Sequence, residues 1–459
     1  MACLPVVIFA VLFRPFQSQC QPVVQSWLTS MDQRNLLAAQ RAVNLAGYSQ
    51  GGTADIIVDQ SVRYQPVEGF GFALTGGSAQ HLIAMDPAKR KMLLRELFGR
   101  EGIGISYLRL SIGASDLNAF VFSYNDLPAG ETDVKLEKFS LAQDELDVVP
   151  VLKEILAISP DIRILGSPWS APVWMKSNGK VQGGRLKDEY YDVYGDYFIR
   201  YIRAMSRHGI RIDAVTVQNE PFNDGNTPSM QFLAKEQLRF VRDYLGPKLA
   251  AAGLKTKLIL YDHNCDAPEY PIAILTDPQA RKYVAGTGFH LYAGPVSAMS
   301  KVHDAFPDKG LYFTEMMAVN RKEFNVAAPV ARIVIGATRN WSRNVILWNL
   351  AADQNDDPHT GNGGCSMCQG AITIEGNQVT RNLAYYTIAH ASKFVPPGSV
   401  RIASTSSGPL AHVAFSTPGG QTVLLVANNS KTAQEFTAGA ATGFFKARLE
   451  HGSVVTYTW

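Results

Sequence analysis

The strongest constraint on the fold is an eightfold alternation of short apolar runs with helix-period stretches, which begins near residue 66. Segments 86–98, 144–158, 188–208 and 229–252 have helical periodicity, and Asp86 and Ser229 are the predicted starts of two of these helices. Eight strand–helix units in one chain predict an α/β fold of the (β/α)8 TIM-barrel class. The eight predicted strands are 69–74, 107–113, 163–170, 213–221, 257–263, 287–293, 311–316 and 344–351.

The C-terminal part of the chain has a different pattern. Short β-rich runs at 400–404, 412–416, 422–427 and 454–459 are separated by turn residues such as Pro418-Gly-Gly. They predict a small antiparallel β-sandwich, and a strand-like run at 54–62 is expected to pair with it, so that N- and C-terminal segments build it together. The predicted division is a signal peptide over 1–20, an N-terminal sandwich segment over 21–65, the catalytic barrel over 66–395 and the C-terminal sandwich over 396–459.

The N-terminus resembles a secretory signal. Residues 4–13 are apolar, and Ser18-Gln-Cys20 places small residues before a plausible cleavage point. The run is too short for a stable membrane anchor, and no later stretch approaches 18 uninterrupted apolar residues. We therefore expect a secreted, periplasmic or extracellular protein (lysosome-like in a eukaryote) with no integral membrane segment. Any lipid contact would be peripheral.

Charge and cysteine content exclude several classes of partner. The chain has 43 basic and 40 acidic side chains, a formal net charge of +3, and no long run of one sign, which argues against a nucleic-acid partner. Cys365 and Cys368 form a single Cys-x-x-Cys motif, whereas a structural zinc site needs a second pair. A local disulfide is favoured over two free thiols, and Cys265 is left over. No metal site is expected.

Two glutamates at predicted strand ends suggest the chemistry. The fourth strand ends in Asn219-Glu220-Pro221 and the seventh ends in Glu315. The carboxyl ends of barrel strands share one face, which is where barrel enzymes place their catalytic groups. Two facing carboxyls cleave a glycosidic bond with retention when one acts as acid/base and the other as nucleophile. A salt-bridged structural role is the alternative for either glutamate alone.

The other strand ends add side chains suited to a sugar. Arg109 is expected to orient Glu315 and keep it ionised, while the pKa of Glu220 is expected to be raised by its negative neighbour. For Arg109 and His290, a supporting structural role stays open beside direct substrate contact. The predicted substrate-binding residues are Asp116, Trp169, Asn219, His290, Tyr292 and Trp348.

An ordered set of motifs resembles glycoside hydrolase family 30, the family of acid β-glucosidase (glucosylceramidase). The resemblance covers residue 66 to the C-terminus and implies a (β/α)8 barrel with a β-sandwich, retention of configuration and no cofactor. It implies that Glu220 is the acid/base, that Glu315 is the nucleophile, and that the terminal glucose contacts Asp116, Trp169, Asn219 and Trp348. The motifs are Gly69-Phe-Gly-Phe-Ala-Leu-Thr-Gly, Tyr107-Leu-Arg-Leu-Ser, Gly166-Ser-Pro-Trp-Ser-Ala-Pro-Val-Trp-Met-Lys, Gln218-Asn-Glu-Pro, Phe289-His-Leu-Tyr, Phe313-Thr-Glu and Leu347-Trp-Asn-Leu-Ala.

Two departures bear on the substrate. Gly76-Gly77 stands where the glucosylceramidase branch has an aspartate, and segments 353–365 and 261–265 look more like microbial members, some of which are endo-β-1,6-glucanases. The leading prediction is a glucosylceramidase-like retaining β-glucosidase acting on a β-glucoside or β-glucan. The alternatives are an endo-β-1,6-glucanase and, less favoured, a xylanase. A loop over 359–368 that closes the far end of the sugar site would indicate exo action.

Two readings from other classes are weighed against these. A non-catalytic carbohydrate-binding protein would be expected to lack one carboxylate, and both glutamates are present. A metal hydrolase would need a cluster such as His263 with Asp262 and Asp266. A plain hydrogen bond between Asp262 and His263 is the favoured interpretation of that group.

Overall fold

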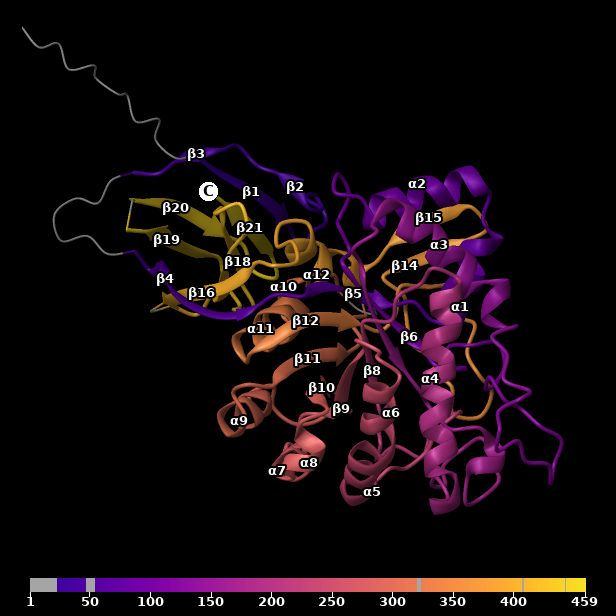
Figure 1. The fold of residues 1–459 in the computed structure, drawn as a ribbon. Helices are drawn as coiled ribbons and strands as arrows, with labels where there is room; N and C mark the ends of the chain where they lie inside the picture. The colour runs from indigo at the N-terminus through magenta and orange to yellow at the C-terminus, as the bar shows by residue number, and fades with distance from the viewer. Residues whose placement is uncertain (1–22, 47–53, 320–322, 407, 442) are drawn as a thin grey trace, which may run out of the picture.

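The computed structural model describes residues 23–46, 54–319, 323–406, 408–441 and 443–459. Its central feature is a closed barrel of eight parallel strands in the order β10-β11-β12-β5-β6-β7-β8-β9, which confirms the predicted fold class (Figure 1). The predicted signal peptide lies outside the described residues. The barrel strands are β5 (Gly69–Ala73), β6 (Tyr107–Ser111), β7 (Arg163–Ser167), β8 (Ala214–Thr216), β9 (Lys257–Asn264), β10 (Val284–His290), β11 (Gly310–Glu315) and β12 (Ser342–Leu347).

Helices cover the outside of the barrel (Figure 1). Asp86 caps α2 as predicted, since its side chain accepts hydrogen bonds from the backbone N–H groups of Ala88 and Lys89. The predicted helix start at Ser229 is wrong: Ser229 is buried in a loop, and α5 begins at Ala234. The helices are α1 (Gly76–Ala84), α2 (Pro87–Phe98), α3 (Val148–Ile158), α4 (Tyr191–Arg207), α5 (Ala234–Phe240), α6 (Gly246–Ala251), α7 (Glu269–Thr276), α8 (Pro278–Arg281), α9 (Ala298–Ala305), α10 (Ala327–Pro329), α11 (Gly336–Arg339) and α12 (Leu383–Ser392).

The second module is a β-sandwich with its own core. Its strand order is β2-β1-β21-β18-β17-β16-β4-β19-β20, with β3 beside β1. Phe445 and Tyr457 come from strands far apart in this order, yet their rings lie 4.6 Å apart, so the sheet folds over itself. The strands are β1 (Val23–Thr29), β2 (Ala38–Ala39), β3 (Val43–Asn44), β4 (Ile56–Pro66), β16 (Val400–Ser406), β17 (Ala411–Ser416), β18 (Thr422–Ala427), β19 (Gln434–Ala440), β20 (Gly443–Leu449) and β21 (Val454–Thr458).

Both ends of the chain build this sandwich, as predicted. Strand β1 pairs with β21, and β4 pairs with both β16 and β19. The module packs on the barrel through α12, where Trp27 lies 4.5 Å from Phe394 and the buried His390 contacts Thr29 and Thr456. The sandwich therefore supports the barrel away from the mouth that carries the strand ends.

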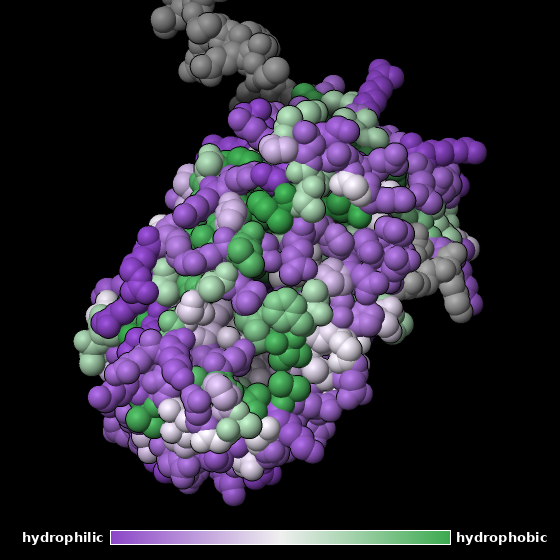
Figure 2. All heavy atoms as spheres, turned by 90° about the vertical axis from the view of Figure 1, so that its right-hand side faces the viewer, coloured by the Kyte–Doolittle hydropathy of each residue, from purple (hydrophilic) through white to green (hydrophobic). Residues whose placement is uncertain are grey.

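The segment after β12 adds a small sheet beside the barrel. Strand β13 (Ala351–Ala352) pairs with β14 (Ile372–Glu375), which pairs with β15 (Gln378–Arg381). Figure 2 shows the face toward which the β11 and β12 arrows of Figure 1 point, with hydrophobic side chains gathered near its middle. Among the described residues, no helix is both long and apolar enough to span a membrane.

Candidate active site

The two predicted catalytic glutamates lie on different sides of the barrel mouth. Glu315 is the last residue of β11, and Glu220 lies in the segment that follows β8. Glu220 has a φ of +46°, a conformation that residues other than glycine rarely adopt. Its backbone N–H donates to the Asp262 carbonyl at 3.0 Å. Because of this turn, β8 ends at Thr216, whereas the predicted strand extended to residue 221. The turn also fixes the backbone of Glu220.

Asp262 occupies a bulge in β9. Tyr261 and Asp262 have φ values of +69° and +64°, and the register with β10 shifts there. Bulges of this kind re-aim a side chain. The Asp262 carboxylate is fully buried and accepts hydrogen bonds from the hydroxyls of Ser167, Thr216 and Thr314 at 2.7, 2.8 and 2.5 Å. A negative charge is thereby fixed beneath the mouth of the barrel.

Arg109 of β6 joins this charge to the predicted nucleophile. Its guanidinium is fully buried and donates to Glu315 Oε2 at 2.6 Å and to Asp262 Oδ2 at 2.8 Å. It also donates to Asn219 Oδ1 at 2.7 Å and lies 4.7 Å from the centre of the Trp169 ring. Two carboxylates compensate the buried cation, and such a pair keeps its geometry because breaking it is costly. The expected orientation of Glu315 by Arg109 is thus present.

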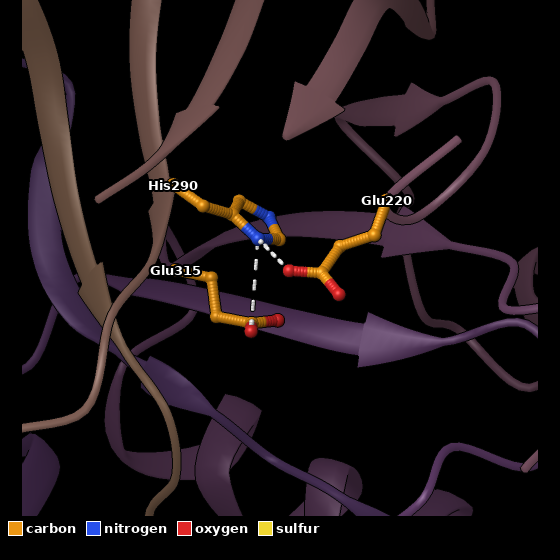
Figure 3. A group of neighbouring side chains, drawn as sticks. All are labelled: Glu220, His290 and Glu315. Carbon is orange, nitrogen blue, oxygen red and sulfur yellow. Dashed lines mark hydrogen bonds and ion pairs between the residues drawn. The ribbon is translucent and has the colours of Figure 1, made fainter. Parts of the chain in front are cut away.

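His290, the last residue of β10, lies between the carboxylates (Figure 3). Its Nδ1 is 3.0 Å from Glu220 Oε1 and 3.7 Å from Glu315 Oε1, while its Nε2 is 3.1 Å from Asp262 Oδ1. One ligand-type atom from each of Glu220, His290 and Glu315 lies within 4.8 Å of the others. Asn223 donates to Glu220 Oε2 at 2.6 Å. Both oxygens of Glu220 are therefore held by the protein.

The charges in this cluster set the protonation of its members. Burial alone would lower the pKa of His290, but the charge of Glu315 and hydrogen bonds to Asp262 and Glu220 raise it to about 10. Burial alone would raise the pKa of Glu220, but the hydrogen bond and charge of His290, with a contribution from His263, lower it to about 2. In the free protein the proton therefore lies on His290.

The expected rise in the pKa of Glu220 is wrong in direction. The pKa of Glu220 is lowered rather than raised, because His290 stands between it and Glu315. The charge of Arg109 does lower the pKa of Glu315 as expected, but complete burial outweighs it and the net shift is upward. Burial and the charges of Glu315 and Glu220 also raise the pKa of Asp116 to about 8. The sequence contains no sign that His290 is charged and lowers the pKa of Glu220.

A pocket of about 320 Å³ opens above the cluster. Both glutamates line it, and Asp116, Tyr292 and Trp348 are the predicted substrate-binding residues that also do so. The Tyr292 hydroxyl donates to Glu315 Oε1 at 3.1 Å. The complete lining consists of Asp116, Glu220, Phe222, Asn223, Asn226, His263, Asn264, Tyr292, Glu315, Met317, Trp348, Cys365 and Cys368.

Comparison with known proteins identifies the chain. The model of the glycosyl hydrolase family 30 TIM-barrel domain matches residues 67–395, and that of the family's β-sandwich domain matches residues 398–457. The chain belongs to glycosyl hydrolase family 30. It is therefore a glycosidase, and its substrate is a glycan.

The relatives of this family 30 member include endo-1,6-β-glucanases and glucosylceramidases. The chain is 35% identical to an endo-1,6-β-D-glucanase of Neurospora crassa over 83% of its length and 82% of the relative. It is 29% identical to the lysosomal acid glucosylceramidase of Mus musculus over 86% of its length and 82% of the relative. A solved endo-β1,6-glucanase structure matches with a TM-score of 0.87 and 33% identity, covering 95% of this chain and 98% of that one.

The remaining predicted residues of this glycosidase lie just behind the pocket wall. Trp169 stacks under Trp348 with ring centres 5.2 Å apart, and its buried Nε1 has no hydrogen-bond partner among the described residues. Asn219 and His290 are also buried and do not line the pocket. The predicted hydrogen bond between Asp262 and His263 is wrong: Asp262 turns to Arg109 and His290 instead.

The loop after β12 forms one wall of the family 30 pocket. The predicted disulfide between Cys365 and Cys368 is present, Cys265 is a buried free thiol, and both bridged cysteines line the pocket. Thr360 of the same loop donates its N–H to the Asp116 carbonyl at 2.9 Å. Sequence reasoning missed Asp262, Asn223 and Phe222 as parts of the site. The first lies at a bulge that no motif marks, and the other two follow Glu220 in a loop.

Proposed function

We propose that the protein is a retaining endo-β-1,6-glucanase in which Glu315 is the nucleophile and Glu220 is the acid/base. The observation that carries the retaining mechanism is the separation of the two carboxylates. One oxygen of each lies within 4.8 Å of the other. Retaining glycosidases have carboxyls about 5–5.5 Å apart, whereas inverting enzymes leave roughly 6.5–9.5 Å for a water molecule. The short separation supports direct attack on the sugar.

In the first step Glu315 attacks the anomeric carbon as the bond to the leaving oxygen breaks. Glu220 supplies a proton to that oxygen. His290 Nδ1 carries this proton in the free protein, and its 3.0 Å contact with Glu220 Oε1 is a path for the transfer. The transfer leaves a neutral imidazole beside a protonated Glu220. It therefore requires bound sugar to reverse the order of the two pKa values, which are about 10 for His290 and about 2 for Glu220 in the free protein. Arg109 holds Glu315 Oε2 at 2.6 Å, which fixes the attacking carboxylate.

In the second step water replaces the leaving group. Glu220, now ionised, takes a proton from the water, the water oxygen attacks the anomeric carbon, and the bond to Glu315 breaks. Asp116 and Trp348 line the pocket where the reacting sugar would lie, and Trp169 Nε1 lacks a partner behind them. These groups suit the hydroxyls and the apolar face of a glucosyl unit.

Similarity to characterised enzymes favours an endo-β-1,6-glucanase over a glucosylceramidase-like β-glucosidase. Endo-1,6-β-glucanases match at 33–35% identity, compared with 29% for the mouse glucosylceramidase. We therefore place the glucosylceramidase-like β-glucosidase second. One observation favours it: the pocket is only about 320 Å³, and the Cys365–Cys368 wall closes one side. We further propose, from the N-terminal sequence, that the enzyme is exported.

The deciding experiment follows hydrolysis of a linear β-1,6-glucan, an aryl β-glucoside and glucosylceramide over time. A spread of oligosaccharides from the polymer supports the endo-glucanase. Glucose released one unit at a time, with rapid cleavage of the small substrates, would replace that proposal with the β-glucosidase. Proton NMR of the first product identifies its anomer, and an initial α-anomer would contradict retention.

A further inference from the structure

Two large aromatic side chains that line the pocket are exposed: Phe222, and Tyr292, which is 37% exposed and bonded to Glu315. Phe222 is 44% exposed and lines the same pocket as Glu220, from which it is separated in the chain only by Pro221. On the other wall Trp348 and Cys368 are covered, at 3% and 2% exposed. Phe222 therefore offers an open apolar ring to a ligand in the pocket, directly beside the acidic group.

The ring of Phe222 is held in place although one side is open. It makes edge-to-face contacts with His263 at 5.7 Å and with Tyr270 of α7 at 5.4 Å. Both partners are buried, and His263 also lines the pocket. The segment after β8, the end of β9 and the start of α7 thus fix one flat apolar surface. A surface fixed in advance loses little conformational freedom when a ligand covers it.

The chemistry places the departing sugar on this side of the pocket. In a retaining mechanism the nucleophile attacks one face of the anomeric carbon and the leaving group departs from the other. Glu220 must contact the leaving oxygen, so the departing unit lies next to the loop that carries Glu220 and Phe222. Asn226 and Asn264 line the same pocket and offer amide groups for its hydroxyls.

We propose that Phe222 is the specificity-determining face of the leaving-group subsite, where it stacks on the glucosyl unit that departs. This rests on the proposed retaining mechanism. The same subsite then binds a sugar acceptor in the reverse direction. The acceptor hydroxyl oxygen bonds to the anomeric carbon, the bond to Glu315 breaks, and the hydroxyl proton goes to Glu220. Phe222 therefore governs both cleavage of glucan and transfer to sugar acceptors.

The test compares Phe222→Ala with Phe222→Tyr and with the control Phe120→Ala. Phe120 is 50% exposed in the loop after β6 and does not line the pocket. Each variant is assayed on β-1,6-glucan and on β-glucosyl fluoride, whose leaving group is too small to reach Phe222. Transfer from the fluoride to gentiobiose as acceptor is measured as the ratio of transfer product to free glucose.

Phe222→Ala should reduce kcat/KM on glucan about 10- to 100-fold. This is the range expected when the burial of a phenylalanine side chain against the substrate is lost. Phe222→Ala should lower the transfer ratio similarly, while fluoride hydrolysis should fall much less than glucan cleavage. Phe222→Tyr keeps a flat ring and should therefore retain both glucan cleavage and the transfer ratio. Phe120→Ala should match the wild type in both. Equal losses on glucan and fluoride would indicate a merely structural ring and overturn the proposal, as would wild-type glucan cleavage and transfer in Phe222→Ala.

The design separates this proposal from the proposed function. If the wild type cleaves the fluoride and not β-1,6-glucan, the proposed polymer is wrong, while the transfer ratio still tests Phe222. If Phe222→Ala fails to fold, Phe222→Leu keeps an apolar side chain and removes the flat ring. Its expected result is a lowered transfer ratio with a much smaller change in fluoride hydrolysis, and an unchanged ratio would contradict stacking.

Discussion

Two buried histidines in this protein have opposite protonation. His290 at the barrel mouth and His390 at the junction with the sandwich are both fully buried. The pKa of His290 is raised to about 10 because Glu315, Asp262 and Glu220 outweigh burial. The pKa of His390 is lowered to about 3 by burial. Its ring nitrogens face the hydroxyls of two threonines at 2.8 and 2.9 Å, and those hydroxyls carry no charge.

The contrast shows that burial by itself does not decide charge. Hydroxyl partners satisfy a neutral imidazole and make His390 a structural link between α12 and the sandwich strands. Carboxylate partners stabilise an imidazolium and keep His290 charged between Glu220 and Glu315. The following predictions test that difference, in order of decreasing effect at neutral pH.

The largest effect is expected from Glu315→Gln. An amide cannot form the covalent glycosyl intermediate, so kcat on an aryl β-glucoside should fall about 10⁴-fold or more. The variant keeps the shape of the side chain, and its thermal unfolding should stay close to that of the wild type. Near-normal turnover would refute the nucleophile role and with it the reading of the charged cluster as catalytic.

Glu220→Gln should have a smaller effect that depends on the leaving group. Loss of the general acid should reduce kcat/KM about 10³-fold on glucan, whose leaving alkoxide needs a proton. Activated aryl glucosides need little acid assistance and should lose much less at the first step. A series of aryl leaving groups of graded acidity measures this dependence. Equal losses across the series would count against the acid role.

His290→Asn should come third, with a loss of roughly 100-fold in kcat/KM because a fixed charge beside the reacting groups is removed. Without the histidine cation the pKa of Glu220 should rise. Activity that depends on ionised Glu220 as base should therefore fall at a higher pH in the variant than in the wild type when the solution is acidified. The pH profiles of wild type and variant measure the shift. Superimposable profiles would show that His290 does not set the protonation of Glu220.

The fold was largely readable from the sequence because its signals are local and repeated. All eight barrel strands overlap the predicted runs, although β8 is much shorter than predicted, and the run at 54–62 pairs with the sandwich as expected. The misplaced helix start has a tertiary cause. The Ser229 side chain accepts from the Gly183 N–H, and its carbonyl accepts from Lys176, so it holds two loops together. Capping residues and loop-binding residues look alike in a sequence.

The site was predicted in its residues more than in its electrostatics. Strand ends identified Glu220, Glu315 and Arg109, because a parallel barrel brings such positions to one mouth. The fall in the pKa of Glu220 was missed, since it depends on His290 lying within 3.0 Å of Glu220. Asp262 was missed because its role depends on backbone conformation at a bulge, which no residue type signals.

The smallest effect at neutral pH is expected from His390→Gln. Loss of a satisfied buried hydrogen bond should lower the free energy of unfolding by about 1 kcal/mol and leave glycosidase activity unchanged. A folded-state pKa below that of the unfolded chain means that the contribution of neutral His390 is complete above about pH 6.5. It is lost as the pH falls toward 3, at roughly 1.4 kcal/mol per pH unit.

The His390→Gln variant lacks this pH-dependent contribution, so near pH 4.5 it should become the more stable protein. Urea unfolding of both proteins at pH 7 and 4.5 measures the crossing. A constant stability difference would mean that folding does not shift the pKa of His390, and the contrast with His290 would fail.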